Sequence, residues 1–170
     1  MKNLSELKTA YDNLIDLLTA VTKQAAANTS ADDIANTFKA EFMFYAGALT
    51  LCDGEIADEE LETLSAVFEY PFDHAKVVQA ARGFADTMNE IPMSLIIACG
   101  IDNDAAENKE LPLLSFYVVS MFANIAKAVV SADEQLHEDE LKLTVGYVNI
   151  LSEFMNKTLS DAAKAKMPKE

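Results

Sequence analysis

Two short acidic segments of the chain carry carboxylates that could bind a cation. The first spans residues 53–61 and reads DGEIADEEL; the second spans residues 133–141 and reads DEQLHEDEL, an offset of 80 residues (133 minus 53). Carboxylate oxygens are the ligands that the hard cations Ca²⁺ and Mg²⁺ prefer. If the segments face each other across a pseudo-twofold axis, four carboxylates and water would form one divalent-cation site. Its predicted ligands occupy matching positions in the two segments: Asp53, Glu60, Asp133 and Glu140.

Neither segment can bind calcium alone, although the first mimics the second half of an EF-hand loop. In that alignment Asp53 takes the fifth position of the loop and Glu60 the twelfth, so oxygen ligands are also needed at the first and third positions. The first copy has Leu49 and Leu51 there. Calcium takes about six to eight oxygen ligands. A self-contained EF-hand is therefore excluded, and a metal site would have to combine both segments.

Helix capping is the alternative role for the same acids. Asp53 suits a turn through hydrogen bonds to its own backbone, and Gly54 supplies a positive φ. Acids at a helix start are favoured by the helix dipole, and Glu60 could reach back to the amide of the N-cap residue. The N-cap residues would then be Ala57 and His137, and neither is a favourable one. Capping therefore explains part of the motif, and a metal site remains open beside it.

Other catalytic arrangements are missing from the sequence. Glu134 and His137 form an E-x-x-H pair, which di-iron bundles use in two copies. The other histidine, His74, has Pro71 three residues before it, so a second pair does not exist. We therefore predict that His137 is an exposed turn residue. The chain has no G-x-S-x-G, no phosphate-binding glycine loop and no H-E-x-x-H, and we predict that it is not an enzyme.

The charge of the chain restricts its partners. Its net charge is −15, and Arg82 is its only arginine. A nucleic-acid or anionic-membrane surface needs a basic face, which is lacking here. The acidity favours cations or basic protein surfaces, or it serves solubility alone. No signal peptide or membrane-spanning stretch is visible. Cys52 and Cys99 are predicted to be reduced thiols, as in a cytosolic protein. We predict a cytoplasmic protein that binds a protein partner and neither binds nucleic acid nor inserts into a membrane.

Helices are the elements expected to position the acids. The 170 residues include only 5 glycines and 4 prolines, and good helix formers dominate. Apolar periodicity predicts about seven helices in one all-α domain with an internal helix-turn-helix repeat. The expected helices are residues 4–27, a second that carries Ile34 to Leu49, then about 58–70, 73–88, 92–101, 112–130 and 138–157. We divide the chain into an N-terminal amphipathic helix (1–29), a helical domain (30–158) and a frayed tail (159–170).

The first helix has an apolar stripe at heptad spacing. Leu4, Leu7, Tyr11, Leu14 and Leu18 alternate at intervals of three and four residues. A stripe this short packs against the core of its own chain, or it pairs with a partner helix or a second copy. Helix 4–27 could therefore mediate a homodimer.

The two acidic motifs resemble those of the tellurite-resistance TerB-like family. That family carries a paired D-G-x-[IL]-x-x-x-E motif, which the first copy matches; the second has Glu134 in place of the glycine. The resemblance covers about residues 35–155. It implies an all-helical domain whose two motifs face a common acidic surface, with a role in tellurite or metal stress and in assembly with other proteins. It implies no particular reaction.

Overall fold

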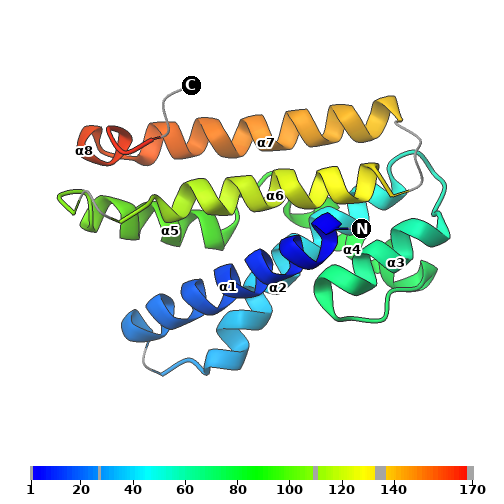
Figure 1. Ribbon diagram of the computed structural model, residues 1–170, viewed down its shortest axis with the longest axis horizontal. Helices are drawn as coiled ribbons and strands as arrows, with labels where there is room; N and C mark the ends of the chain where they lie inside the picture. Colours follow the sequence, from blue (N-terminus) through cyan, green and yellow to red (C-terminus); the bar gives the residue numbers. More distant parts are fainter. Residues whose placement is uncertain (1, 27, 109–110, 133–136, 168–170) are drawn as a thin grey trace.

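The chain folds into helices. The computed structural model describes residues 2–26, 28–108, 111–132 and 137–167, which contain eight helices and no strand (Figure 1). The predicted all-α class is therefore confirmed. In chain order the helices are α1 (Lys2–Ala25), α2 (Ala31–Leu51), α3 (Asp58–Phe68), α4 (His74–Thr87), α5 (Met93–Asp104), α6 (Leu114–Val130), α7 (Glu138–Thr158) and α8 (Asp161–Lys164).

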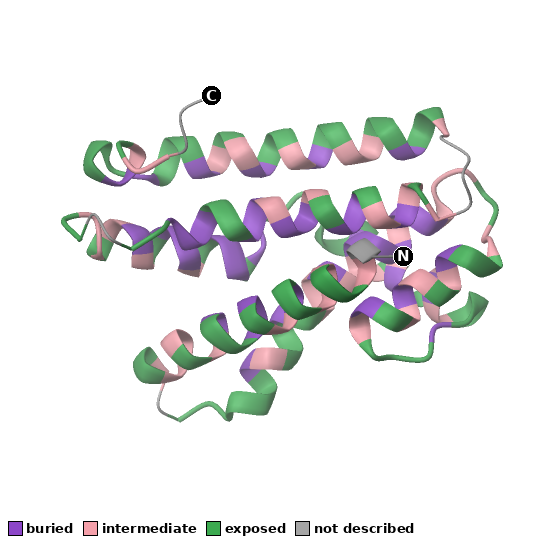
Figure 2. Ribbon diagram, in the orientation of Figure 1, coloured by how far each residue is buried: buried purple, intermediate pink, exposed green. Residues whose placement is uncertain are grey.

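Helix α6 lies at the centre of the bundle, in contact with α1, α2, α3, α5 and α7. Figure 2 shows buried residues concentrated along α6 and α5, whereas α1 and α7 have exposed outer sides. Aromatic rings from three helices meet in this core. The centroid of the Tyr45 ring lies 5.4 Å from that of Phe122 and 4.9 Å from that of Tyr147. The apolar α6 therefore organises the helices that carry the acidic motifs.

Helices α2 and α4 approach each other closely at a glycine. A Cβ atom added to Gly47 would lie 2.5 Å from the Cβ of Ala80 and 3.2 Å from the carbonyl oxygen of Val77. Glycine inside a helix costs about 1 kcal/mol relative to alanine. The close approach of the two backbones is what requires it here.

Two helices begin with caps that come from other helices. Pro92 and Leu113, the N-cap residues of α5 and α6, make no side-chain capping bond. Instead Glu41 of α2 accepts hydrogen bonds from the Met93 amide (2.5 Å) and the Ser94 amide (3.2 Å) at the start of α5. Asp102 of α5 does the same for α6. It accepts bonds from the amides of Leu114 and Ser115, both at 2.8 Å, and from the Ser115 hydroxyl at 2.5 Å.

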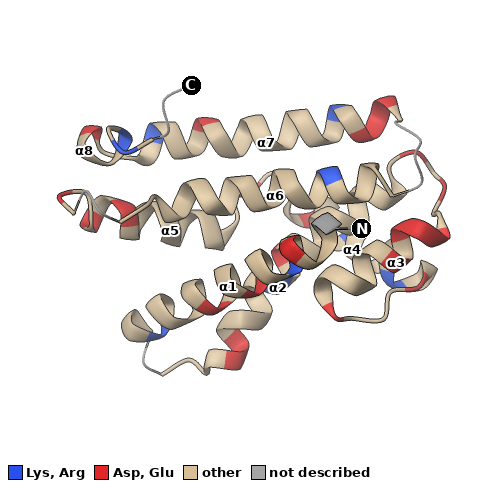
Figure 3. Cartoon of the chain, viewed as in Figure 1, with Lys and Arg blue, Asp and Glu red and all other residues tan. Residues whose placement is uncertain are grey.

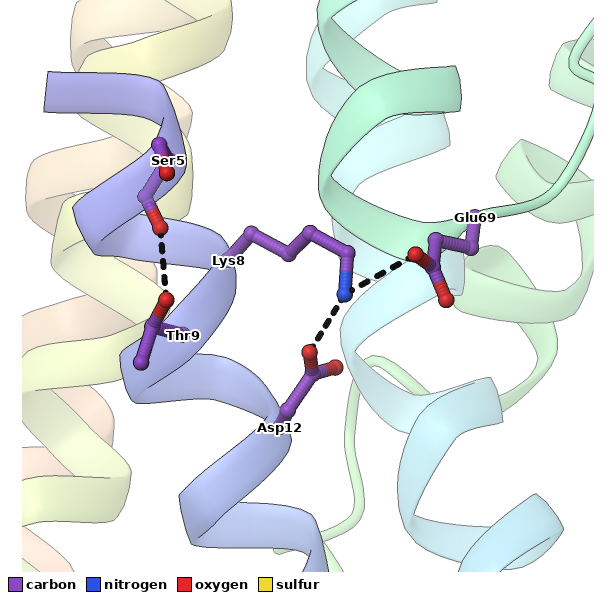
Figure 4. A network of polar contacts seen from close by, with 5 residues as sticks. All are labelled: Ser5, Lys8, Thr9, Asp12 and Glu69. Carbon is purple, nitrogen blue, oxygen red and sulfur yellow. Dashed lines mark hydrogen bonds and ion pairs between the residues drawn. The ribbon is translucent and has the colours of Figure 1, made fainter. Parts of the chain in front are cut away.

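A polar network joins α1 to the end of α3 (Figure 4). Lys8 Nζ contacts the Asp12 carboxylate one turn along α1 and lies 3.1 Å from Glu69 Oε1. The Thr9 hydroxyl donates to the Ser5 carbonyl on the same helix. Glu69 ends α3 in a left-handed conformation, with φ of 49°. This conformation is uncommon for a residue with a Cβ. Because Glu69 pairs with Lys8, the end of α3 lies against α1.

The apolar stripe of α1 packs against the core of its own chain. Tyr11, Leu14 and Leu18 are buried in the common core, together with Ile15. Helix α1 thus shares its core with the other helices. Packing against the chain's own core is confirmed, and the homodimer through residues 4–27 stays a prediction.

The C-terminal tail differs from expectation. We predicted fraying over residues 159–170, but α8 forms within that range. Ser160 caps α8 by accepting from the Ala163 amide at 3.2 Å, and Leu159 and Ala163 are buried. The tail is also bonded to α5, because the Ser160 amide donates to Asn103 Oδ1 at 2.7 Å and Asn103 Nδ2 donates to the Thr158 carbonyl at 3.1 Å. Residues 168–170 lie outside the described part of the chain.

Candidate functional site

The two acidic motifs lie at the same end of the molecule. Figure 3 shows acidic residues where α3 and α7 begin, both toward the same end of the bundle. The motifs touch through His137, whose Nε2 lies 3.3 Å from Oδ2 of Asp53. The chain therefore brings Asp53 and His137, which are 84 residues apart in sequence (137 minus 53), into direct contact.

The first turn holds its aspartate in a fixed position. Asp53 Oδ1 accepts a hydrogen bond from the Glu55 amide at 3.0 Å, and Gly54 has φ of +89°. These are the features expected of an Asx turn with a glycine in the left-handed region. The Asp53 side chain is only 16% exposed. Its other oxygen, Oδ2, faces His137. Asp133, the corresponding residue of the second turn, lies outside the described residues.

Glu60 and Glu140 are the buried acids of the repeat and make the same contact. Glu60 Oε2 accepts from the Ala57 amide at 2.9 Å, and Glu140 Oε2 accepts from the His137 amide at 3.1 Å. Ala57 and His137 make no side-chain capping bond in return. Each glutamate thus supplies the reciprocal half of a capping box. The capping interpretation of these two residues is confirmed, since both carboxylates face the start of their own helix.

A polar cavity of about 240 Å³ opens beside the first turn. Its charged and titratable lining residues are Asp53, Glu55, Glu59, Glu60 and His137. Neither lysine nor arginine is among the described residues that line it, so its electrostatic potential favours a cation. Sequence reasoning missed His137, which we expected to be an exposed turn residue. The available signal was a histidine directly before an acidic helix start.

The four predicted ligands are brought together only in part. Asp53 and Glu60 line the cavity, whereas Glu140 does not. Among the described residues no group of three or more histidine, cysteine, aspartate or glutamate side chains is arranged to hold a metal ion. The described part of the site therefore lacks a ready-made metal centre, and the metal site stays a prediction in which Asp133 would take part.

Cys52 is the C-cap residue of α2 and directly precedes Asp53 of the first acidic turn. Burial raises the pKa of this half-buried thiol to about 12, and the charges of Glu140, Asp53 and Asp139 add to the effect. Burial likewise raises the pKa of Cys99 to about 11. Both thiols are therefore protonated and poorly nucleophilic near neutral pH.

Cys52 should react slowly with alkylating agents in the folded protein. Its raised pKa leaves about a thousandfold less thiolate at pH 8 than an ordinary cysteine has. In a Cys99→Ala variant we expect iodoacetamide to label native Cys52 at least about a hundredfold more slowly than the same chain in urea. Adding Glu140→Gln should speed native labelling, because the amide keeps an acceptor for the His137 amide and removes a negative charge. Labelling rates within tenfold of each other in native and denatured protein would contradict the assignment.

Comparison with known proteins adds no family to this description. No protein-family model, curated protein or solved structure matches the chain. In the described part of the chain, none of the helices combines the length and the apolar character needed to cross a membrane. The described residues thus define an all-α domain in which the first acidic turn contacts His137 at the start of α7.

Proposed function

We propose that this chain is a non-enzymatic, TerB-like binding module whose paired acidic turns bind a divalent cation. Cation binding would be coupled to docking of a protein partner on the same acidic end. The resemblance of the two motifs to the TerB-like family further suggests a cytoplasmic role in tellurite or metal stress. The proposal depends on the site and on the family resemblance together.

The observation that carries the proposal is the acidic cavity at the contact between the turns. Four carboxylates and one imidazole line it, and the Asp53–His137 distance of 3.3 Å puts groups from both turns at one point. Hydrated Ca²⁺ and Mg²⁺ need only a few protein carboxylates and complete their shells with water. The imidazole of His137 adds a ligand type that suits Zn²⁺ and other first-row ions.

Different acids would have different roles in such a site. Asp53 is the candidate ligand, because its Oδ2 points out of the turn while Oδ1 keeps the turn closed. Glu55 and Glu59 are exposed and line the same cavity, so they could approach an ion. Glu60 and Glu140 would act as positioning residues, since each bonds to the start of its own helix.

A metal-free helical adaptor is the second candidate function. The two reciprocal caps and the His137–Asp53 contact already account for the buried acids without an ion. In that case the acidic end would recognise a basic protein surface directly. The effect of divalent ions on stability separates the two functions.

Divalent ions should raise the thermal midpoint of the chelator-treated protein selectively. A ligand at about 100 times its Kd adds about 2.7 kcal/mol to the unfolding free energy, which raises the midpoint of a domain of this size by roughly 5–11 °C. We would compare Ca²⁺, Mg²⁺ and Zn²⁺ at matched ionic strength. Asp53→Asn, alone and with Asp133→Asn, should abolish the rise, because asparagine keeps the turn but not the charge.

The control is Glu107→Gln, which removes the same charge at an exposed position in the turn that follows α5. It should leave the rise unchanged. An equal rise with every divalent ion that persists in Asp53→Asn would indicate general screening of the net charge, and it would favour the metal-free adaptor. The absence of any rise would favour the adaptor as well.

A further inference from the structure

A second cavity, of about 390 Å³, lies away from the acidic turns. It is bounded by α2, the end of α4, the α4–α5 connection, the start of α5 and α7. Its volume falls in the range of small-molecule sites, about 300–1,000 Å³. The residues that give it chemical character are Glu41, Phe44, Phe84, Glu90, Met93 and Tyr147.

Three aromatic rings line this cavity and are held in place by packing. The Phe84 and Tyr147 rings meet edge to face, with centroids 5.0 Å apart. The Phe44 ring lies against the backbone of Gly83, where an added Cβ would come within 2.8 Å of the ring. Rings fixed in this way lose little conformational freedom when a ligand binds. Aromatic walls attract cations through the negative faces of the rings.

Two carboxylates give the cavity its charge. Glu41 is half-buried, and its two oxygens accept from the amides of Met93 and Ser94. Each carboxylate oxygen has a further lone pair that could face a ligand. Burial raises the pKa of Glu41, and its hydrogen bonds with Ser94 and Met93 oppose that shift. Glu90 is exposed and forms no ion pair with any residue in the described part of the chain.

The same residues exclude other classes of ligand. No lysine, arginine or histidine is among the described residues that line the cavity, so an anion would be repelled. A metal ion would find few oxygen ligands among the described lining residues, because both Glu41 oxygens already accept amide hydrogen bonds and most of the wall is apolar. A purely apolar ligand would cover the Glu41 carboxylate without compensating its charge. A bare ammonium is strongly hydrated and would lose water bonds that apolar walls cannot replace.

We propose that this cavity binds an alkylated ammonium group, with its methyl groups against Phe44, Phe84 and Tyr147 and its charge between Glu41 and Glu90. Alkylation removes N–H donors and adds apolar surface, which matches aromatic and aliphatic walls. The start of α5 partly compensates the charge of Glu41, so Glu90 supplies the uncompensated charge. The group could belong to a free small molecule or to a methylated lysine side chain. The site is independent of the acidic turns.

Calorimetric titration of the full chain tests this assignment. The probes are choline and a short peptide with one trimethyl-lysine. Their controls are 3,3-dimethyl-1-butanol, which has carbon in place of the choline nitrogen, and the same peptide with unmodified lysine. We expect saturable binding of an alkylammonium probe and at least tenfold weaker binding of its uncharged or unmethylated control. Preference for choline would identify a free small molecule, and preference for the peptide a protein side chain.

Two variants locate the binding. Glu90→Gln at the exposed mouth and Phe44→Leu at the half-buried wall should each weaken binding about tenfold, while circular dichroism verifies folding. Glu107→Gln and Asp53→Asn should leave it unchanged. The proposal is overturned if neither alkylammonium probe binds, or if the neutral isostere of choline binds as tightly as choline. Binding that Glu90→Gln and Phe44→Leu both leave unchanged would also overturn it.

Discussion

Replacing Asp102 with alanine should lower the unfolding free energy by about 3–5 kcal/mol. Asp102 is only 3% exposed and accepts three hydrogen bonds at the start of α6. Its loss would leave the Leu114 and Ser115 amides without this acceptor, and a buried group left unsatisfied costs about 1–3 kcal/mol. The start of α6 would also lose the negative charge that its dipole favours. The thermal midpoint should fall by roughly 6–20 °C.

Two further substitutions make this result specific. Asp102→Asn keeps one acceptor oxygen and should cost less than alanine. Asp104→Ala changes an exposed acid two residues further along the same helix, and it should shift the midpoint by about 2 °C or less. If Asp102→Ala and Asp104→Ala had equal effects, the capping of α6 by α5 would not contribute to stability.

Gly47→Ala should destabilise the protein by about 1–3 kcal/mol even though alanine is the better helix former. The added methyl group would meet Ala80 Cβ at 2.5 Å and the Val77 carbonyl oxygen at 3.2 Å. Overpacking of this kind typically costs about 1–3 kcal/mol after partial relaxation. Urea unfolding should show a lower midpoint. The slope of the unfolding free energy against urea concentration should change little, because the surface exposed on unfolding is nearly the same.

Gly146 provides the matched control on α7. It is exposed, and a Cβ added there meets no atom within 4 Å. Gly146→Ala should therefore stabilise the protein by up to about 1 kcal/mol through helix propensity. Opposite signs at the two glycines would separate close packing from propensity. A stabilising Gly47→Ala would mean that α2 and α4 can move apart without cost.

Local patterns were enough to predict most of the helices. Apolar residues at intervals of three and four predict seven helical segments, and Ser30 followed by an acid three residues later is a local sequence signal for an N-cap. Its hydroxyl accepts from the Asp33 amide at 3.0 Å. The capping role of Glu60 was also open to prediction, since the cap spans three residues and a helix start is visible in the sequence.

The contacts between distant segments could not be predicted in the same way. Glu41 and Met93 are separated by 52 residues, and Asp102 and Leu114 by 12. A single acid in an apolar helix contains no information about which distant amide it meets. The contact between His137 and Asp53 has the same origin. The repeat predicted that the turns correspond, whereas only the packing around α6 determines which side chains touch.

The caps that Glu41 of α2 and Asp102 of α5 supply to other helices have a consequence for how the bundle unfolds. Helix α5 starts where α2 supplies an acceptor, and α6 starts where α5 supplies one. Opening α2 therefore exposes the first amides of α5, and opening α5 exposes those of α6. Such mutual dependence joins neighbouring helices into one cooperative unfolding unit. The first turn of α6 can open only together with α5. Its amide hydrogens should therefore exchange slowly, and hydrogen exchange should give them the same opening free energy as the amides of α5.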